Sequence, residues 1–502
     1  MALIWYSGDP KPSDSNEGLW IYNGFDCMLT LEVCNVLLPK LNEVTQQTYD
    51  FARDLQAPVL FMQAHGVLVD KPRRNEVAEI LRAKLAGVRS SLNEILEQGL
   101  GIYGLNPASP DQLKDLFYNK LGIPPIRNRG AITTNRKALE RIRGYFQAES
   151  IANHILAIRD ISKQLQVLQT GIDPDGRIRT SYKIAGTDTG RFASSGSAFW
   201  TGTNLQNITG ELRYIFIADP GYKLAYIDLS QAESRAVGGI IWNLFQDGRY
   251  LDACESGDLH TTVCRMCWAD LPWTGVLAED KRIANKPFYR HFSYRDASKR
   301  LGHATNYFGK PPHIAKEVHI PLELVQGFQN AYIPAFGLAA WHQWVRRKLL
   351  ADGWITTFMG RFRWFFGRRW DDETLRSAIA YEPQSAVADI LNRGLFRVYK
   401  AFMGGEIRAK LLLQVHDAIV VEYPEEDENT VIPYIQALLE QPIQLLHGRE
   451  LSIPTDAMVG WNWAYSRNAK KEVTNPDGLE PFTGNDTRTR SAKSSFLDRR
   501  FS

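Results

Sequence analysis

The stretch LLLQVHDAIVVEY, residues 411–423, decides which fold we expect for this chain. Two apolar runs flank the polar pair His416-Asp417, which is the pattern of a β-hairpin whose turn projects from a core. Hairpin formation needs no carboxylate between two apolar strands, and an unpaired buried charge is costly. Asp417 therefore indicates a cation or a hydrogen-bond partner at the tip of the hairpin.

A second strand-end aspartate lies upstream, in the segment KLAYIDLSQAESRAVGGI. An apolar strand over residues 224–227 ends at Asp228, and sequence of helical character follows. If Asp228 and Asp417 converge, they form a centre for two divalent ions roughly 3.5–4 Å apart, which clamps the attacking and leaving oxygens of a phosphoryl transfer. Taken alone, each aspartate is as readily a solvated turn residue or a helix cap.

The composition bounds the class of protein. The chain has 502 residues, 44% hydrophobic and 23% charged, which is enough for several subdomains around a large core. No apolar run approaches the roughly 18 residues of a membrane span, and the N-terminus lacks a signal-peptide pattern. We therefore expect a cytoplasmic protein with no membrane partner. Because the net charge is only +3, any affinity for nucleic acid has to come from local patches.

The five cysteines are sparse and odd in number, which argues against a disulfide framework. A zinc site at His260, Cys264 and Cys267 is the alternative. These residues would form a stripe along one helix that is too long to close around a single tetrahedral ion.

The first fifty residues contain Tyr22 and Asp26, four apart, followed by an apolar run. This pair is similar to the last motif of 3′–5′ proofreading exonucleases, but the other carboxylates of that site have no room before Trp20. Residues 1–50 are therefore interpreted as a remnant or C-terminal tail of an exonuclease domain. A plain N-terminal helix is the alternative. From residue 51 to about 172 the pattern becomes strongly helical, with a helix start at Ser109.

A run of motifs follows in a fixed order. GTDTGRFASS and NLQNI, in the loop of residues 175–208, resemble landmarks of the family A DNA polymerases, the bacterial polymerase I family. DLSQAESR at 228–235 is similar to motif A of that family, RDASKRLGHATNY at 295–307 to motif B, and QVHDA at 414–418 to motif C. The chain is identified as a member of this family, of phage type and lacking a complete 3′–5′ exonuclease domain.

The resemblance implies an α+β right-hand fold with an antiparallel palm sheet, a helical thumb and helical fingers. The implied segments are a palm helix and thumb at 51–172, palm at 173–250 and 376–464, and fingers at 251–375. Helical periodicity stops after Ala464, and we expect residues 465–502 to be a disordered tail. This tail is either inert or a partner-docking segment anchored by Phe496, Leu497 and Phe501.

The resemblance also implies the site. Asp228, Asp417 and the backbone carbonyl of Leu229 would bind two Mg²⁺ ions, which Mn²⁺ can replace, for template-directed addition of dNMP to a primer 3′-hydroxyl with release of pyrophosphate. Glu233 would exclude a ribose 2′-hydroxyl. The implied nucleotide-binding residues are Gln231, Glu233, His260, Arg295, Lys299, His303 and Tyr307. The implied DNA-binding residues are Arg191, Asn204, Gln206, Gln384 and His416.

Three positions depart from the family pattern. His303 stands where a Phe or Tyr is usual, Ala418 replaces the glutamate that often follows the motif C aspartate, and Ala380 replaces an asparagine four residues before Gln384. None of them removes an implied metal ligand, so we expect activity to survive. Two basic and aromatic segments, 268–292 and 360–370, favour either contact with single-stranded template or simple packing of the rings.

The expected partners are primer-template DNA and dNTPs, and the expected role is phage genome replication by a monomer in the host cytoplasm. We expect no proofreading from this chain alone, with an exonuclease, helicase or processivity factor on separate proteins. Two alternatives remain. A single-subunit RNA polymerase is opposed by Glu233, and a catalytically silent primer-template binding protein is opposed by the intact set of Asp228, Asp417, Arg295 and Lys299.

Overall fold

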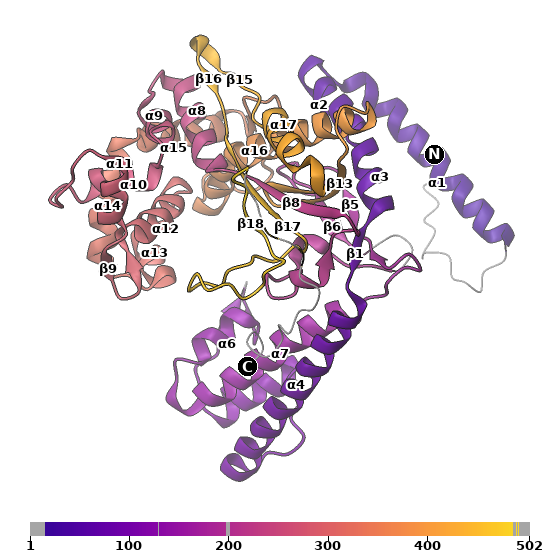
Figure 1. Ribbon diagram of the computed structural model, residues 1–502. Coiled ribbons are helices and arrows are strands. Elements are labelled where there is room, and N and C mark those ends of the chain that lie inside the picture. Colours follow the sequence, from indigo (N-terminus) through magenta and orange to yellow (C-terminus); the bar gives the residue numbers. More distant parts are fainter. Residues whose placement is uncertain (1–15, 129, 197–200, 485–487, 489, 491–502) are drawn as a thin grey trace.

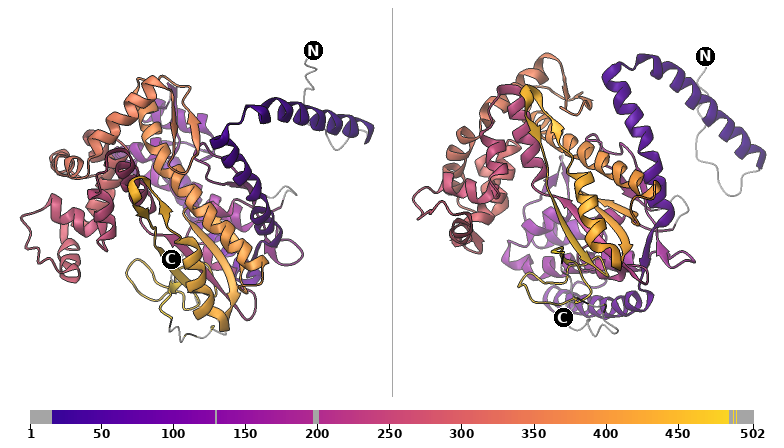
Figure 2. Two further views of the ribbon diagram at one scale, coloured as in Figure 1. Left: turned by 90° about the horizontal axis from the view of Figure 1, so that it is seen from above. Right: turned by 45° about the horizontal axis from the view of Figure 1, so that its top comes forward.

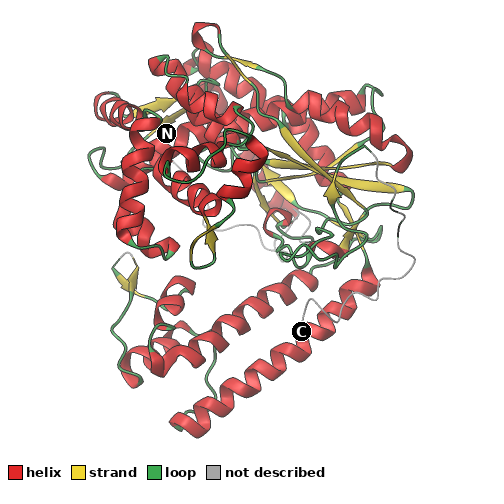
Figure 3. Cartoon of the chain, turned by 60° about the vertical axis from the view of Figure 1, so that its left-hand side comes forward, coloured by secondary structure: helices red, strands yellow, loops and turns green. Residues whose placement is uncertain are grey.

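The computed structural model describes residues 16–128, 130–196, 201–484, 488 and 490. Figure 1 shows a central sheet with a helical arm below it and a second helical lobe to one side. Figures 2 and 3 show the same three parts from other directions, and Figure 2 shows a helix near the N-terminus projecting away from the sheet. Within the described part of the chain, no helix has the length and apolar character needed to cross a membrane.

The central sheet has the order β13-β14-β8-β17-β18, and every neighbouring pair is antiparallel. Its strands are β13 (Lys410–Val415), β14 (Ala418–Pro424), β8 (Tyr222–Leu229), β17 (Thr455–Gly460) and β18 (Glu480–Pro481). The predicted hairpin is confirmed, since β13 and β14 pair on either side of His416-Asp417. His416 takes a positive φ of 55°, which a two-residue hairpin loop commonly needs at its first position.

The two faces of the sheet are buried against different elements. Ile227, Ile419 and Val421 pack in one core with residues of α16 (Asp372–Met403) and α17 (Glu428–Leu439). Tyr226 and Val420 belong to the core on the opposite face. Because side chains alternate along a strand, Asp228 lies on the same face as Tyr226. The carboxylate therefore points away from α16, toward the side where the helical arm joins the sheet.

The register sets the neighbours of Asp228. Ala418 of β14 lies opposite it on one side, and Asp456 of β17 lies opposite it on the other. Directly opposed residues of an antiparallel pair share a face, with their Cβ atoms about 4.5–5.5 Å apart. Asp456 and Asp228 thus project from the sheet side by side.

The helical arm is the predicted thumb. Its long helices α4 (Lys71–Leu100) and α7 (Glu149–Leu168) pack along each other, and α4 ends at Gly101 in the left-handed conformation that favours glycine. Ser109 caps the helix that was predicted to begin there. The other elements of the arm are α5 (Pro110–Lys114), η2 (Asp115–Lys120), β2 (Arg127–Asn128), β3 (Ala131–Ile132), α6 (Arg136–Ile142) and η3 (Phe146–Ala148).

The arm joins the palm through short elements. Strand β1 (Val67–Val69), which follows α3 (Gln56–His65), pairs with β4 (Arg177–Ile178) and β7 (Phe216–Ile217) in a second small sheet. The loop region between them holds β5 (Ser181–Lys183), β6 (Ala193–Ser195), η4 (Leu205–Asn207) and η5 (Arg213–Ile215). These elements place the segments before Asp228 against the back of the hairpin.

The second lobe has a hydrophobic core of its own. It contains the segment predicted as fingers, residues 251–375, together with α8 and the start of α9, which lie in the segment predicted as palm. Helix α12 carries motif B and begins with a capping box between Ser293 and Asp296. The helices are α8 (Ala232–Phe245), α9 (Arg249–Glu255), α10 (Leu259–Cys267), α11 (Leu277–Ala284), α12 (Tyr294–Asn306), α13 (Pro311–Val318), α14 (Leu322–Ala335) and α15 (Leu338–Ala351). The strands are β9 (Pro287–Tyr289), β10 (Phe292–Ser293), β11 (Trp354–Thr356) and β12 (Phe362–Trp364).

The N-terminal helix α1 (Asn16–Leu37) is largely apolar, yet none of its residues is buried and Trp20 is 73% exposed. Figures 1 and 2 show it standing away from the rest of the molecule. It continues through η1 (Leu38–Lys40) into α2 (Glu43–Asp54). The helix is present as the sequence predicted, but it has no partner among the described residues that buries its apolar side chains.

Order continues past Ala464, so the prediction of a disordered tail is wrong for residues 465–484. Strand β18 pairs with β17, and Tyr465 forms a bridge with Leu479. The buried amides of Asn462 and Asn475 bond each other at 2.8 and 2.9 Å. Side-chain and backbone hydrogen bonds order this segment. Order of this kind needs no regular spacing of apolar residues, so the sequence pattern does not reveal it. Phe496, Leu497 and Phe501 lie outside the described residues. The remaining palm elements are η6 (Glu425–Asp427), β15 (Ile443–Gln444), η7 (Leu446–Gly448) and β16 (Glu450–Leu451).

Candidate active site

A pocket of about 520 Å³ lies between the end of β8, the tip of the hairpin and helices α10 and α12. It contains Asp228 and Asp417, so the two strand-end aspartates do converge. The backbone N–H of Leu229 donates to the carbonyl of Asp417 at 3.1 Å, which holds the hairpin tip against the end of β8. Of the residues predicted from the sequence, the pocket is lined by Asp228, Leu229, Gln231, Glu233, His260, Arg295, Lys299, His303 and Asp417.

The carboxylates of the pocket repel one another. Burial, and then the charges of Asp417 and Asp456, raise the pKa of Asp228 to about 6, while Lys299 opposes the shift. Burial also raises the pKa of Asp417, together with the charge of Glu233 and against the charge of Arg191. Like charges held this close favour a bound cation. Carboxylate oxygens are also the ligands that Mg²⁺ prefers, so the donor set fits divalent metal ions.

Glu233 connects three parts of the site. Its carboxylate accepts a hydrogen bond from Arg191 at 2.9 Å and another from the Tyr307 hydroxyl. The same guanidinium donates to Asp417 at 3.1 Å. The His303 ring meets the Tyr307 ring edge-on with centroids 4.9 Å apart. Arg191 and Tyr307, which do not line the pocket themselves, are thereby fixed to a residue that does.

Helix α12 and the start of α10 form a basic wall. Arg295, Lys299 and His303 share one face of α12 and line the pocket, and Tyr307 follows as its C-terminal cap residue. Arg295 donates twice to Asp258, each time at 3.1 Å. Because Asp258 is the residue before α10, this ion pair fixes Arg295 next to His260.

His260 is neutral at physiological pH. Burial and the charge of Arg295 lower the pKa of its imidazole to about 4. The hydroxyl of Ser298 donates to the backbone carbonyl of His260 at 3.2 Å, which ties α10 to α12. The ring can therefore donate or accept a hydrogen bond at this wall without adding charge.

The predicted DNA-binding residues lie around the back of the hairpin and on α16. The amide of Gln206 donates to the side chain of Gln414 at 2.7 Å, and Asn204 accepts from the hydroxyl of Ser194. His416 occupies the hairpin turn, and Gln384 is half-buried on α16. Like Arg191 and Tyr307, these four residues are outside the pocket lining.

Asp456 and Asp258 are site residues that motif reading missed. Asp456 lines the pocket and faces Asp228 across the sheet. Its only sequence signal is a lone acid in the strand TDAMVG, whose pairing with β8 the sequence does not reveal. Asp258 stands in the stretch GDLH, residues 257–260, two residues before His260. Its burial and its pairing with Arg295 depend on the packing of α10 against α12, which the sequence does not reveal.

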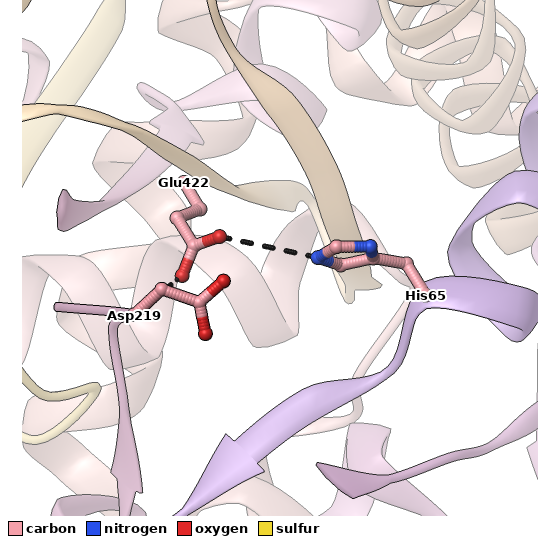
Figure 4. Close-up of side chains that lie close together, drawn as sticks. All are labelled: His65, Asp219 and Glu422. Atoms are coloured by element: carbon pink, nitrogen blue, oxygen red, sulfur yellow. Dashed lines mark hydrogen bonds and ion pairs between the residues drawn. The ribbon is translucent and has the colours of Figure 1, made fainter. Parts of the chain in front are cut away.

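A second carboxylate cluster lies elsewhere on the sheet. Figure 4 shows His65, Asp219 and Glu422, which form the one group of three His, Cys, Asp or Glu residues in the described chain whose ligand atoms all lie within 4.8 Å of one another. Arg177 bonds both oxygens of Asp219 at 2.6 Å. Lys410 lies 3.5 Å from Asp219 and 3.4 Å from Glu422. Two cations thus match the two carboxylates, and the cluster is an ion-pair network.

The sheet with two strand-end aspartates, the helical arm and the second helical lobe form the right-hand polymerase fold. Residues 75–465 match the sequence model of DNA polymerase family A, and the chain belongs to that family. The family and the α+β fold class expected from the sequence are confirmed.

Individual members of the family also match the chain in sequence and in structure. The chain is 26% identical over 480 residues to DNA polymerase I of Chloroflexus aurantiacus, covering 88% of this chain and 46% of that protein. It is 27% identical over 438 residues to the thermostable DNA polymerase I of Thermus aquaticus, covering 81% and 47%. The chain spans about half the length of these curated relatives. The POL domain of Pol1 from M. smegmatis, solved with DNA primer-template and dNTP, shares the fold with a TM-score of 0.66 at 22% identity, over 82% of this chain and 69% of that one.

Proposed function

We propose that this protein carries out DNA-template-directed DNA synthesis, adding dNMP from dNTP to a primer 3′-hydroxyl and releasing pyrophosphate. One observation carries the proposal. Asp228 and Asp417 converge in a pocket whose opposite wall presents Arg295 and Lys299, within a chain that belongs to DNA polymerase family A.

Asp228, Asp417 and the backbone carbonyl of Leu229 would hold two Mg²⁺ ions, and Mn²⁺ would fit the same oxygen ligands. When bound, such ions lower the pKa of the attacking hydroxyl and neutralise charge on the leaving pyrophosphate. Asp456 adds a third carboxylate on the same face of the sheet. We propose that it helps to retain the ions, because Ala418 on the other side of Asp228 offers no oxygen ligand.

The basic wall holds the nucleotide. Arg295 and Lys299 contact the triphosphate from one helix face, and neutral His260 supplies a hydrogen bond beside them. Gln231 and His303 line the path of the sugar and base, and Tyr307 lies next to the template base. Since Arg191 and Tyr307 hold Glu233 in place, its carboxylate is positioned to exclude a ribose 2′-hydroxyl.

The duplex would bind behind the hairpin. Arg191, Asn204, Gln206, Gln384 and His416 surround the primer terminus and the minor groove, where acceptors common to all base pairs allow geometry to be checked without reading sequence. Arg191 pairs with Asp417 and Glu233, so its contact with DNA requires these bonds to be shared or exchanged. Arg191 therefore couples primer placement to the acid that binds metal.

The biological setting completes the proposal. We propose a monomeric replicase of a phage genome, acting in the host cytoplasm. Residues 1–50 would be the tail of an exonuclease domain. The exposed apolar side chains of α1 support contact with another protein, such as an exonuclease, a helicase or a processivity factor.

Primer extension tests the function. The full chain, a labelled primer-template and Mg²⁺ should give products with dNTPs, little product with rNTPs, and none after chelation of the metal. No shortening of the primer is expected when dNTPs are omitted. Efficient use of rNTPs would favour the RNA polymerase alternative, and binding of primer-template without any extension would favour the silent binder.

A further inference from the structure

Three large aromatic side chains lie exposed at the end of β12 and on the segment that follows it. Trp364 is 48% exposed, Phe366 91% and Trp370 71%. We call these three residues the aromatic patch. Arg363, Arg368 and Arg369 are interleaved with them. Rings of this size in contact with water indicate a binding surface.

The patch stands on an ordered scaffold. Trp364 pairs with Trp354 in the β11–β12 hairpin. Phe365, between two exposed rings, is only 4% exposed, and the guanidinium of Arg363 lies 4.6 Å from the centre of its ring. The buried ring anchors the segment while its neighbours face outward. Simple packing, the other interpretation of residues 360–370, accounts for Phe365 but not for Phe366 or Trp370.

Contacts on one side connect the patch to the active site. Arg363 donates to Asp188 at 2.5 Å. Asp188 lies three residues before Arg191, which bonds Asp417. Arg361, just before β12, donates from Nε to Oδ2 of Asp389 at 3.1 Å and from Nη2 to Oδ1 at 2.7 Å, a bidentate ion pair with α16. The patch thus adjoins the loop that carries Arg191.

Contacts on the other side lead to the end of α12. Asp372, two residues after Trp370, pairs with Lys310 and lies 3.6 Å from Arg346. Lys310 comes three residues after Tyr307. The patch therefore lies between the Arg191 loop and the C-terminal end of α12, on the Tyr307 side of the pocket.

A cavity of about 580 Å³ opens beside the patch, lined by Asp188, Glu373, Thr374, Ser377 and residues 362–367. Most of the nearby acids are occupied. Asp371 accepts from the backbone N–H of Thr374 at 2.7 Å, and Asp372 is held in its ion pairs. Among the lining acids, Asp188 pairs with Arg363, which leaves Glu373 beside the arginines. The local surface thus combines aromatic faces with guanidinium groups.

We propose that the aromatic patch binds single-stranded nucleic acid, namely the unpaired template strand ahead of the pocket. This inference rests on the proposed function. Trp364, Phe366 and Trp370 stack on successive bases, and Arg368 and Arg369 contact the phosphates between them. Stacking on aromatic rings tolerates any base sequence, as a template strand requires. The patch would keep the next template bases extended as they approach Tyr307.

The test measures binding and needs no catalysis. Fluorescence anisotropy of the full chain, without dNTPs, compares a primer-template whose template overhangs by one nucleotide with one that overhangs by eight. We expect the longer overhang to bind at least about tenfold more tightly, as stacking of one or two bases supplies. Replacing all three rings by leucine should abolish this preference and leave affinity for the short overhang unchanged.

Leucine keeps the apolar character and removes the aromatic face, so the change separates stacking from general hydrophobic contact. Phe146→Leu is the matched control, because Phe146 is 94% exposed at the start of the thumb helix region, and it should keep the full preference. The rings are exposed, so the melting temperature of the triple variant should match that of the unchanged protein. Photo-cross-linking from 5-iododeoxyuridine in the overhang should map to residues 362–370.

The inference is overturned if the unchanged protein shows no preference for the longer overhang, if the triple variant keeps it, or if the cross-links map elsewhere. These outcomes are separate from the fate of the proposed function. A protein that binds the overhang through the patch but extends no primer would refute polymerase activity and retain the binding site. A protein that extends primers normally but shows no overhang preference would support polymerase activity and refute the binding site.

Discussion

Two carboxylate clusters lie on the same sheet and differ in how their charge is balanced. At Asp219 and Glu422, Arg177 and Lys410 supply two cations at 2.6–3.5 Å. The active-site pocket is lined by four carboxylates (Asp228, Glu233, Asp417 and Asp456) and by two cations, Arg295 and Lys299. Arg295 is already paired with a fifth carboxylate, Asp258, and Arg191 reaches Glu233 and Asp417 from outside the lining. Five carboxylates therefore face three cations.

The balanced cluster is compact and links β4, β13, β14 and the turn between β7 and β8, which carries Asp219. The unbalanced one is spread over the lining of a pocket and retains an excess of negative charge. A cluster of carboxylates therefore indicates a metal site when the carboxylates outnumber the basic side chains around them. A short distance between the carboxylates is not sufficient.

The largest effect should come from the unbalanced cluster. Asp228→Asn removes one metal ligand and should lower primer extension by about a thousandfold or more, equal to roughly 4 kcal/mol of barrier. The variant should fold as well as the unchanged protein or better, because one repelling charge is gone. Steady-state extension rates and thermal melting measure the two effects. Asp219→Asn, the same change in the balanced cluster, should lower the melting temperature and leave the rate of primer extension unchanged. Equal loss of activity in both variants would remove the distinction.

A carboxylate outside both clusters, Glu382 of α16, extends the comparison. It is buried, and one of its oxygens has no hydrogen-bond partner among the described residues. Burial raises its pKa from 4.5 to about 8. The folded state thus holds the proton more tightly than the unfolded state. Its contribution to stability is complete below about pH 4.5 and is lost as the pH rises through 8.

Glu382→Gln should flatten this dependence, which amounts to roughly 1.4 kcal/mol per pH unit in that window. Urea unfolding between pH 5 and pH 9 (roughly the span of the titration) gives the comparison with the unchanged protein. Glu97→Gln, at an exposed position of α4, should leave the dependence as it is. Parallel curves for the unchanged protein and the Glu382 variant would show that the carboxyl does not titrate in this range.

The balanced cluster should be sensitive to loss of a cation. Arg177→Ala leaves Asp219 and Glu422 with Lys410 alone. We expect a loss of about 2–3 kcal/mol in the free energy of unfolding, since a partly buried pair that loses its cation retains an uncompensated charge. Arg408→Ala is the control. Arg408 is 64% exposed and pairs with surface acids, so its removal should cost no more than about 0.5 kcal/mol. Similar losses in the two variants would contradict the structural role of the cluster.

The smallest effect should come from Asp456. Asp456→Asn should weaken Mn²⁺ binding, measured by electron paramagnetic resonance in the absence of DNA, by about tenfold, or ~1.4 kcal/mol. Ala418→Glu in the same variant should restore binding, because position 418 faces Asp228 from the opposite strand. Unchanged binding in Asp456→Asn, or failure of the glutamate to restore it, would mean that Asp456 is no part of the metal site.

Much of the site was predictable because its residues lie close together along the chain. The hairpin tip follows from two apolar runs around His416-Asp417, and the face of α12 follows from the four-residue spacing of Arg295, Lys299 and His303. Both signals are local. They need only the periodicities of a strand and a helix.

Other features were not predictable because they depend on distant partners. The ion pair between Asp258 and Arg295 joins α12 to the residue before α10. Phe365 is buried and Phe366 is exposed because only the first ring points into the packed core of the second lobe. Residues 465–484 look disordered by composition, yet hydrogen bonds to the edge of the palm sheet order them.

The sequence by itself determined the family, the two acids that end their strands, and the basic face of the motif B helix, because each is written in contiguous residues. Only the tertiary structure decided that Asp456 stands beside Asp228, that Arg191 and Tyr307 fix Glu233, and that Asp219 and Glu422 are neutralised. These results depend on the register between strands and on the distances between charges, and both are properties of the packed chain that no single stretch of residues contains.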